Sequence, residues 1–182
     1  MRMIKKLFIC FCIILCSSCG FKKNDIAYLG EYNLVSFFPN GSKVNDSFSF
    51  SDFPIRDLYK IVDSNGRINN QESIIEVIKQ SKKIFISIGY YNTRNVIDNI
   101  AMDLLNSEID LFHYYLYEMI NIIKDINNNI YVSSLLIDNE KNSSIYTLFN
   151  KEIFSVCEET KVNYIDVNSF EDIKRSFYDL FG

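Results

Sequence analysis

The sequence has 182 residues, and 48% of them are hydrophobic, which is enough for one globular domain with a buried core. Its formal net charge is −4. An acidic chain disfavours binding to nucleic acid and electrostatic attraction to anionic lipid.

The N-terminus has the pattern of an export signal. Arg2, Lys5 and Lys6 precede the apolar run from Leu7 to Leu15, and small residues follow that run. A run of this length is too short to span a membrane as a helix. We therefore expect this segment to direct export and to be removed.

The end of the signal resembles the lipobox of bacterial lipoproteins. Ser17 and Ser18 stand directly before Cys19, although Cys16 holds the position where leucine is usual. In such proteins the cysteine is acylated and becomes the mature N-terminus. The resemblance implies a signal peptide over residues 1–18, an acylated Cys19 with a short tether over 19–24, and a location on the extracytoplasmic face of the cell membrane. An ordinary secretory signal is the alternative.

Removal of this signal changes both the cysteine inventory and the charge. Cys10, Cys12 and Cys16 leave with it, so an acylated Cys19 leaves Cys157 without a disulfide partner in its own chain. Cys157 lies in a helical apolar pattern and is expected to be a small core residue. The three lost cations take the net charge from −4 to −7. Membrane attachment is therefore expected to come from the acyl chains.

From Asp25 onward, apolar runs of strand length alternate with helical patterns, as in parallel sheets joined by crossover helices. The segment 31–47, with its Pro39-Asn40-Gly41 turn signal, is expected to be a loop. Strands are expected at 25–29, at "SFSFS" (47–51), and at 84–89, 130–137 and 163–167. Helices are expected at 55–62, 71–81, 96–106, 108–126, 145–160 and 170–181.

This order predicts one domain over residues 25–182, a three-layer α/β/α sandwich with a flavodoxin-like parallel sheet of four to five strands. In such folds the binding crevice lies outside the carboxyl ends of the strands. The predicted ends are Gly30-Glu31-Tyr32, Gly89-Tyr90-Tyr91-Asn92, Asp138-Asn139 and Asp166.

Four segments in this order resemble the SGNH or GDSL hydrolases, which cleave esters on lipids, acylated sugars and polysaccharides. "DIAYLGE" is similar to the strand that leads into Gly-Asp-Ser, and "SFSFSDFPIRDLYKIV" to the second block and its helix. "KKIFISIGYYN" resembles the strand that ends in Gly-x-Asn-Asp. "LFNKEIFSVCEETKVNYIDV" resembles the helix and strand that lead to the final Asp-x-x-His.

The chain departs from this family at its catalytic positions. Glu31 stands for the aspartate of Gly-Asp-Ser, Tyr32 for the serine, Tyr91 for the oxyanion-binding asparagine and Asn92 for the following aspartate. The final Asp-x-x-His is absent, and the sole histidine, His113, falls on a predicted helix. The chemistry needs an activated serine and oxyanion donors, so we expect no catalytic residue.

A relocated nucleophile is the alternative. Ser36, Ser42 and Ser47 lie in the first predicted loop, but none sits in a sharp strand-to-helix turn beside a base. One histidine without clustered cysteines predicts no metal site, and no motif indicates a cofactor.

We expect the old active-site edge to form a ligand crevice in a surface lipoprotein that binds rather than cleaves. The candidate residues are Glu31, Tyr32, Gly89, Tyr90, Tyr91, Asn92 and Arg94. Tyrosine rings beside hydrogen-bonding groups suit a cell-envelope glycan or a protein partner. Alternatively, the rings only fill a vacated pocket. An active ester hydrolase with a nonstandard site is the second expected function.

Overall fold

The computed structural model describes residues 24–67, 73–99, 104–137, 143–167 and 169–181. The expected signal, Cys19 and most of the tether lie outside these residues, as do Asp138 and Asn139. No described helix is both long and apolar enough to cross a membrane.

Five parallel strands form one sheet in the order β2-β1-β3-β4-β5. This is the flavodoxin-like order. It confirms the fold class that the sequence predicts. The strands are β1 (Asn24–Glu31), β2 (Val44–Phe50), β3 (Ser81–Ser87), β4 (Ile130–Ser133) and β5 (Asn163–Ile165).

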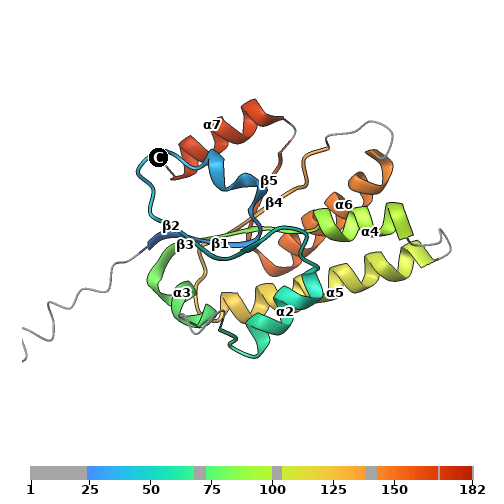
Figure 1. Ribbon diagram of the computed structural model, residues 1–182, viewed down its shortest axis with the longest axis horizontal. Coiled ribbons are helices and arrows are strands. Elements are labelled where there is room, and N and C mark those ends of the chain that lie inside the picture. Colours follow the sequence, from blue (N-terminus) through green and yellow to red (C-terminus); the bar gives the residue numbers. More distant parts are fainter. Residues whose placement is uncertain (1–23, 68–72, 100–103, 138–142, 168, 182) are drawn as a thin grey trace, which may run out of the picture.

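Helices cover both faces of the sheet unequally (Figure 1). They are η1 (Tyr32–Phe37), α2 (Ile55–Asp63), α3 (Ile74–Gln80), α4 (Tyr90–Asn99), α5 (Leu105–Lys124), α6 (Ser143–Thr160) and α7 (Phe170–Phe181). The helices α2 to α6 lie on one side, while α7 and η1 lie on the other. Each face has its own buried apolar cluster. In the thinner layer, Phe177 of α7 packs against Phe38 and Phe85, with ring centroids 4.7 and 4.8 Å away.

Several boundaries differ from the sequence prediction by a few residues, and three differences lie next to the carboxyl ends of the strands. The expected loop after β1 begins with the 3-10 helix η1, because Leu34 and Phe38 are buried there. Helix α4 begins at Tyr90 rather than Val96. Strand β4 ends at Ser133 rather than Ile137, although Leu135 and Leu136 remain buried beyond it.

Candidate functional site

The carboxyl ends of β1 and β3 are held very close together. Gly30 has φ of +113°, and a Cβ atom there would lie 2.3 Å from the carbonyl oxygen of Ser87. Gly89 has φ of +127°, and a Cβ atom there would lie 3.2 Å from the ring of Phe112. Only glycine suits both positions, since L-residues with side chains rarely adopt such φ values. This close approach brings Glu31 to the first turn of α4.

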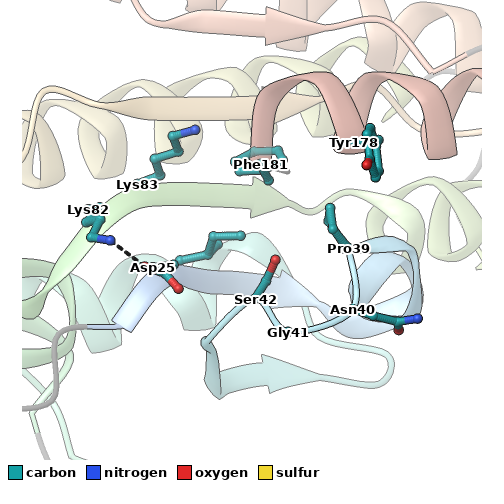
Figure 2. A pocket seen from close by; sticks show the side chains of 10 residues that line it. Asp25, Pro39, Asn40, Gly41, Ser42, Lys82, Lys83, Tyr178 and Phe181 are labelled. Carbon is teal, nitrogen blue, oxygen red and sulfur yellow. Dashed lines mark hydrogen bonds and ion pairs between the residues drawn. The ribbon is translucent and has the colours of Figure 1, made fainter.

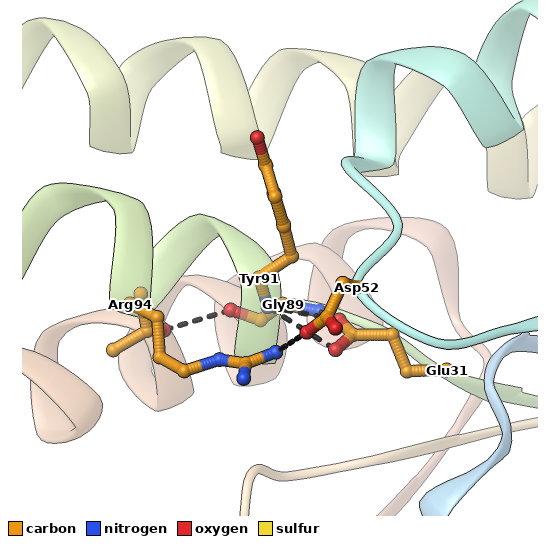
Figure 3. Close-up of polar contacts among 6 residues, drawn as sticks. Glu31, Asp52, Gly89, Tyr91 and Arg94 are labelled. Atoms are coloured by element: carbon orange, nitrogen blue, oxygen red, sulfur yellow. Dashed lines mark hydrogen bonds and ion pairs between the residues drawn. The ribbon is translucent and has the colours of Figure 1, made fainter.

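The Glu31 carboxylate binds the N-terminus of α4 (Figure 3). Its Oε1 accepts a hydrogen bond from the Gly89 N–H at 2.9 Å, and its two oxygens accept from the Tyr91 N–H at 3.2 and 3.1 Å. These N–H groups have no partner within the helix, and the helix dipole favours a negative charge there. Glu31, the last residue of β1, therefore caps the N-terminus of α4.

Burial of Glu31 opposes its ionisation. The residue is 4% exposed, and burial raises the pKa of the Glu31 carboxyl to about 7, although the N–H groups of Gly89, Tyr91 and Tyr90 and the charge of Arg94 act to lower it. The group thus titrates near neutrality.

Tyr90 and Asn92 are also engaged in structural contacts. The Tyr90 hydroxyl accepts from the Leu136 N–H at 2.7 Å. The Asn92 side chain accepts from the Ile55 N–H at 3.1 Å, at the first residue of α2. These side chains join α4 to the segment after β4 and to α2.

Tyr91 and Arg94 face the surface. Tyr91 borders two open hollows of about 270 and 280 Å³. Asn92 lines the first, with Tyr115 and Arg56, and Arg94 lines the second. Arg94 pairs with Asp52, which the sequence analysis did not single out (Figure 3). Asp52 could have been identified from the sequence by its position just after the end of strand β2.

The structure thus brings six of the seven candidate residues to one edge. Glu31 and Gly89 are buried, Tyr90 points toward Leu136, and Tyr91, Asn92 and Arg94 line the hollows. Tyr32 begins η1, and its side chain is outside what the structure describes.

The remaining polar groups considered from the sequence lie in other contexts. His113 on α5 contacts Glu152 at 2.8 Å and Glu159 at 3.6 Å, both on α6. Ser36 is exposed on η1, Ser47 is exposed on β2, and Ser42 lines a hollow at the amino edge of the sheet.

Other polar groups near the carboxyl edge are bound to backbone or to each other. Asn150 of α6, which the sequence analysis quoted without assigning a role, accepts from the Leu135 N–H at 2.7 Å and donates to the Leu135 carbonyl at 3.0 Å. Ser134 contacts Asp166 at 3.4 Å and accepts from the Val167 N–H. In α6, burial raises the pKa of the Cys157 thiol to about 12. No group of three or more potential metal-ligating side chains occurs among the described residues.

Several solved structures with a similar fold are acetylxylan esterases. An acetylxylan esterase from Geobacillus stearothermophilus has a TM-score of 0.59 at 12% identity, covering 88% of this chain and 84% of that one. The acetyl xylan esterase AlAXEase also has a TM-score of 0.59, at 9% identity, over 85% of this chain and 82% of that one.

Catalytic mutants of the Geobacillus enzyme, with a histidine, a serine or an aspartate replaced by alanine, match with TM-scores of 0.58. No protein-family model matches the chain, and a search of curated proteins found no relative. The likeness concerns the fold alone: the chain has the α/β fold of these acetylxylan esterases.

Proposed function

We propose that the protein is a membrane-anchored surface lipoprotein whose SGNH-like domain binds a ligand without cleaving it. The observation that carries this proposal is the Glu31 carboxylate bound to the N–H groups of Gly89 and Tyr91. An ester hydrolase of this kind needs free donors for the developing oxyanion. Here the buried Glu31 side chain already occupies the N–H groups of Gly89 and Tyr91, so neither is free to donate to an oxyanion.

The surroundings of Glu31 support the same conclusion. Asn92 and Tyr90 are bound to backbone N–H groups, and His113 of α5 contacts two carboxylates of α6, those of Glu152 and Glu159. Nucleophilic catalysis by serine needs a base within hydrogen-bond reach of the hydroxyl. His113 lies on α5 against α6, whereas Ser36 is on η1, Ser47 is on β2 and Ser42 is at the amino edge of the sheet. The hydrogen bonds of Glu31, Tyr90 and Asn92 therefore join elements of the fold.

Tyr91 is the proposed centre of ligand binding. Tyr91 and Asn95 line both open hollows, with Arg56 and Asn92 lining the first and Arg94 the second. An aromatic face beside amide and charged groups suits a sugar ring or a peptide. A cell-envelope glycan or a protein partner is the proposed ligand.

The hydrolysis test uses the purified full chain with p-nitrophenyl acetate and acetylated xylooligosaccharides. Rates equal to the buffer background are expected, for the wild type and for Ser36→Ala, Ser42→Ala and Ser47→Ala. Turnover that one of these substitutions abolishes would overturn the proposal. It would instead support the second candidate, an ester hydrolase with a relocated nucleophile, which the esterase identity of the structural neighbours favours.

The binding test measures glycan affinity by titration calorimetry. Tyr91→Ala is expected to weaken binding at least about tenfold, the effect of losing about 1.4 kcal/mol of contact. Tyr114→Ala is the matched control, because Tyr114 is an exposed tyrosine on α5 that does not line either hollow. Equal affinities for the two variants would contradict a site at Tyr91.

The proposed lipid anchor is tested by labelling cells with palmitate. The label should be incorporated into the wild-type protein and should be lost in Cys19→Ala.

A further inference from the structure

A hollow of about 450 Å³ lies at the amino edge of the sheet, opposite the Glu31 edge (Figure 2). It is formed where the starts of β1 and β3, the loop 39–42 and the end of α7 meet. The residues that line it are Asp25, Ile26, Pro39, Asn40, Gly41, Ser42, Lys82, Lys83, Tyr178 and Phe181. The sequence analysis assigned no role to this edge.

Lysines gather around this hollow. Lys82 pairs with Asp25 at 2.6 Å, and Lys83 donates to the Leu180 carbonyl and lies 5.0 Å from the centroid of the Phe181 ring. Lys43 is exposed next to it, and its N–H bonds to Asp25 at 3.2 Å. The three ammonium groups of Lys43, Lys82 and Lys83 outnumber the two carboxylates of Asp25 and the exposed Asp179. This edge is therefore locally basic on an acidic chain.

Exposed aromatic surface accompanies these lysines. Tyr178 is 70% exposed, although its neighbour on the same helix, Phe177, is fully buried. Phe181 is half-buried at the rim. Figure 2 shows Tyr178 facing Pro39 across the opening. Tyrosine and lysine together are the side chains that favour the interface between membrane and water, with apolar bodies inward and polar ends in the headgroup layer.

The chain order places this edge beside the proposed anchor. β1 begins at Asn24, five residues after Cys19, and five residues span at most about 18 Å. Lys22 and Lys23 directly precede β1 in the sequence and add to the basic charge. Basic residues next to a membrane anchor are attracted to anionic lipids.

We propose that this amino edge docks on the membrane and that the hollow binds the phosphate of an anionic phospholipid headgroup. The inference rests on the proposed membrane anchoring. Net charge alone disfavours such binding, but the local charge at the tether favours it, because interactions at the surface are screened beyond about 8 to 10 Å. Docking here would leave the Tyr91 hollows, at the opposite edge, facing away from the membrane.

The test uses the absence of tryptophan from this chain. Tyr178→Trp introduces a single emission reporter at an exposed position, in the full chain reconstituted with vesicles. A shift to shorter wavelength is expected with phosphatidylglycerol vesicles and not with phosphatidylcholine vesicles. Tyr114→Trp, on α5, is the matched control and should not shift in either. A shift of equal size at both positions, or none at Tyr178→Trp, would overturn the docking.

Charge variants and flotation separate the two proposals. In the Tyr178→Trp background, Lys43→Gln with Lys82→Gln should abolish the shift, whereas Lys60→Gln with Lys151→Gln, both exposed elsewhere, should retain it. Retention of the shift in the first pair would overturn the headgroup site, as would the same shift with inorganic phosphate alone. Failure to float with either vesicle would refute the anchor, whereas flotation without the shift would refute only the docking.

Discussion

Glu31 is the residue on which the interpretation of this edge depends. Its pKa of about 7 lies above the ordinary value of 4.5 because the carboxyl is buried. The unfolded chain releases this proton near pH 4.5, and the folded chain retains it until about pH 7. Between those values the folded state binds more protons, so its free energy of unfolding falls as pH rises. The stabilisation is complete below about pH 4.5 and is lost through pH 7.

Replacement of Glu31 by glutamine should remove this pH dependence. The amide keeps an oxygen that can accept from the Gly89 N–H but does not ionise. The wild type should lose up to about 3 kcal/mol of stability between pH 5 and pH 8 that Glu31→Gln does not lose. Urea unfolding at the two pH values measures the difference. Parallel pH profiles for the two proteins would show that Glu31 keeps an ordinary pKa.

Gly30 should be irreplaceable for a different reason, the close approach of two backbones. A Cβ atom at Gly30 would lie 2.3 Å from the Ser87 carbonyl oxygen, whereas one at Gly41 would have nothing within 4 Å. Both residues have positive φ, at +113° and +94°. Gly30→Ala should therefore lower the free energy of unfolding by on the order of 3 to 5 kcal/mol, and Gly41→Ala by about 1 to 2 kcal/mol.

Chemical denaturation of both variants measures this difference, with Gly41→Ala as the control for backbone strain. Similar losses in the two would show that β1 and β3 separate easily at this edge.

At the scale of the element, the start of α4 marks the limit of the sequence prediction. The apolar strand predicted at 84–89 is found at Ser81–Ser87, so its end was placed within two residues and its start within three, because a buried strand is a local apolar pattern. Tyr90, Tyr91 and Asn92 carry no apolar periodicity, so the sequence predicted a helix only from Val96. The cap of this helix is Glu31, 58 positions before Gly89. A local sequence pattern cannot predict a capping residue that is so distant in the sequence.

The candidate site was predicted to the same extent. Parallel topology places the strand ends together, so Glu31, Gly89 and Tyr91 were expected at one edge and are found there. The roles within the edge depend on side-chain directions, which sequence spacing does not specify. For example, the Tyr90 side chain points toward Leu136 and the Asn92 side chain toward Ile55, and sequence spacing predicted neither direction.

Asn150 provides a second long-range support, between α6 and the segment after β4. Its amide accepts from the N–H and donates to the carbonyl of Leu135. Asn150→Asp is isosteric but loses the donor and places a carboxylate oxygen against that carbonyl. The free energy of unfolding should fall by about 1 to 3 kcal/mol. Asn106→Asp, exposed in the first turn of α5, should change it by no more than about 0.5 kcal/mol. Equal midpoints in thermal unfolding would argue against the Leu135 contacts.

At the scale of the whole molecule, the two faces of the sheet are covered to different extents. Five helices lie on one side, while α7 and the short η1 cover the other (Figure 1). The aromatic cluster of the thinner layer includes Tyr28, Phe38, Phe85 and Phe177. Burial raises the pKa of Tyr28, whose hydroxyl donates to the Glu31 carbonyl. The layer beneath α7 therefore extends to the backbone of the candidate site.

Phe177 and Tyr178 offer a matched comparison for the importance of α7. They are neighbours on one helix, but Phe177 is fully buried and Tyr178 is 70% exposed. Phe177→Ala removes the ring that packs against Phe38 and Phe85 and leaves a cavity in the layer that covers this face. The free energy of unfolding should fall by about 3 to 5 kcal/mol. Tyr178→Ala should change it by about 0.5 kcal/mol or less, since little of that ring is buried. Urea unfolding followed by far-UV circular dichroism measures both. Equal small losses would mean that α7 is not needed to close this face, and the amino-edge hollow, which α7 helps to form, would then lack a fixed wall.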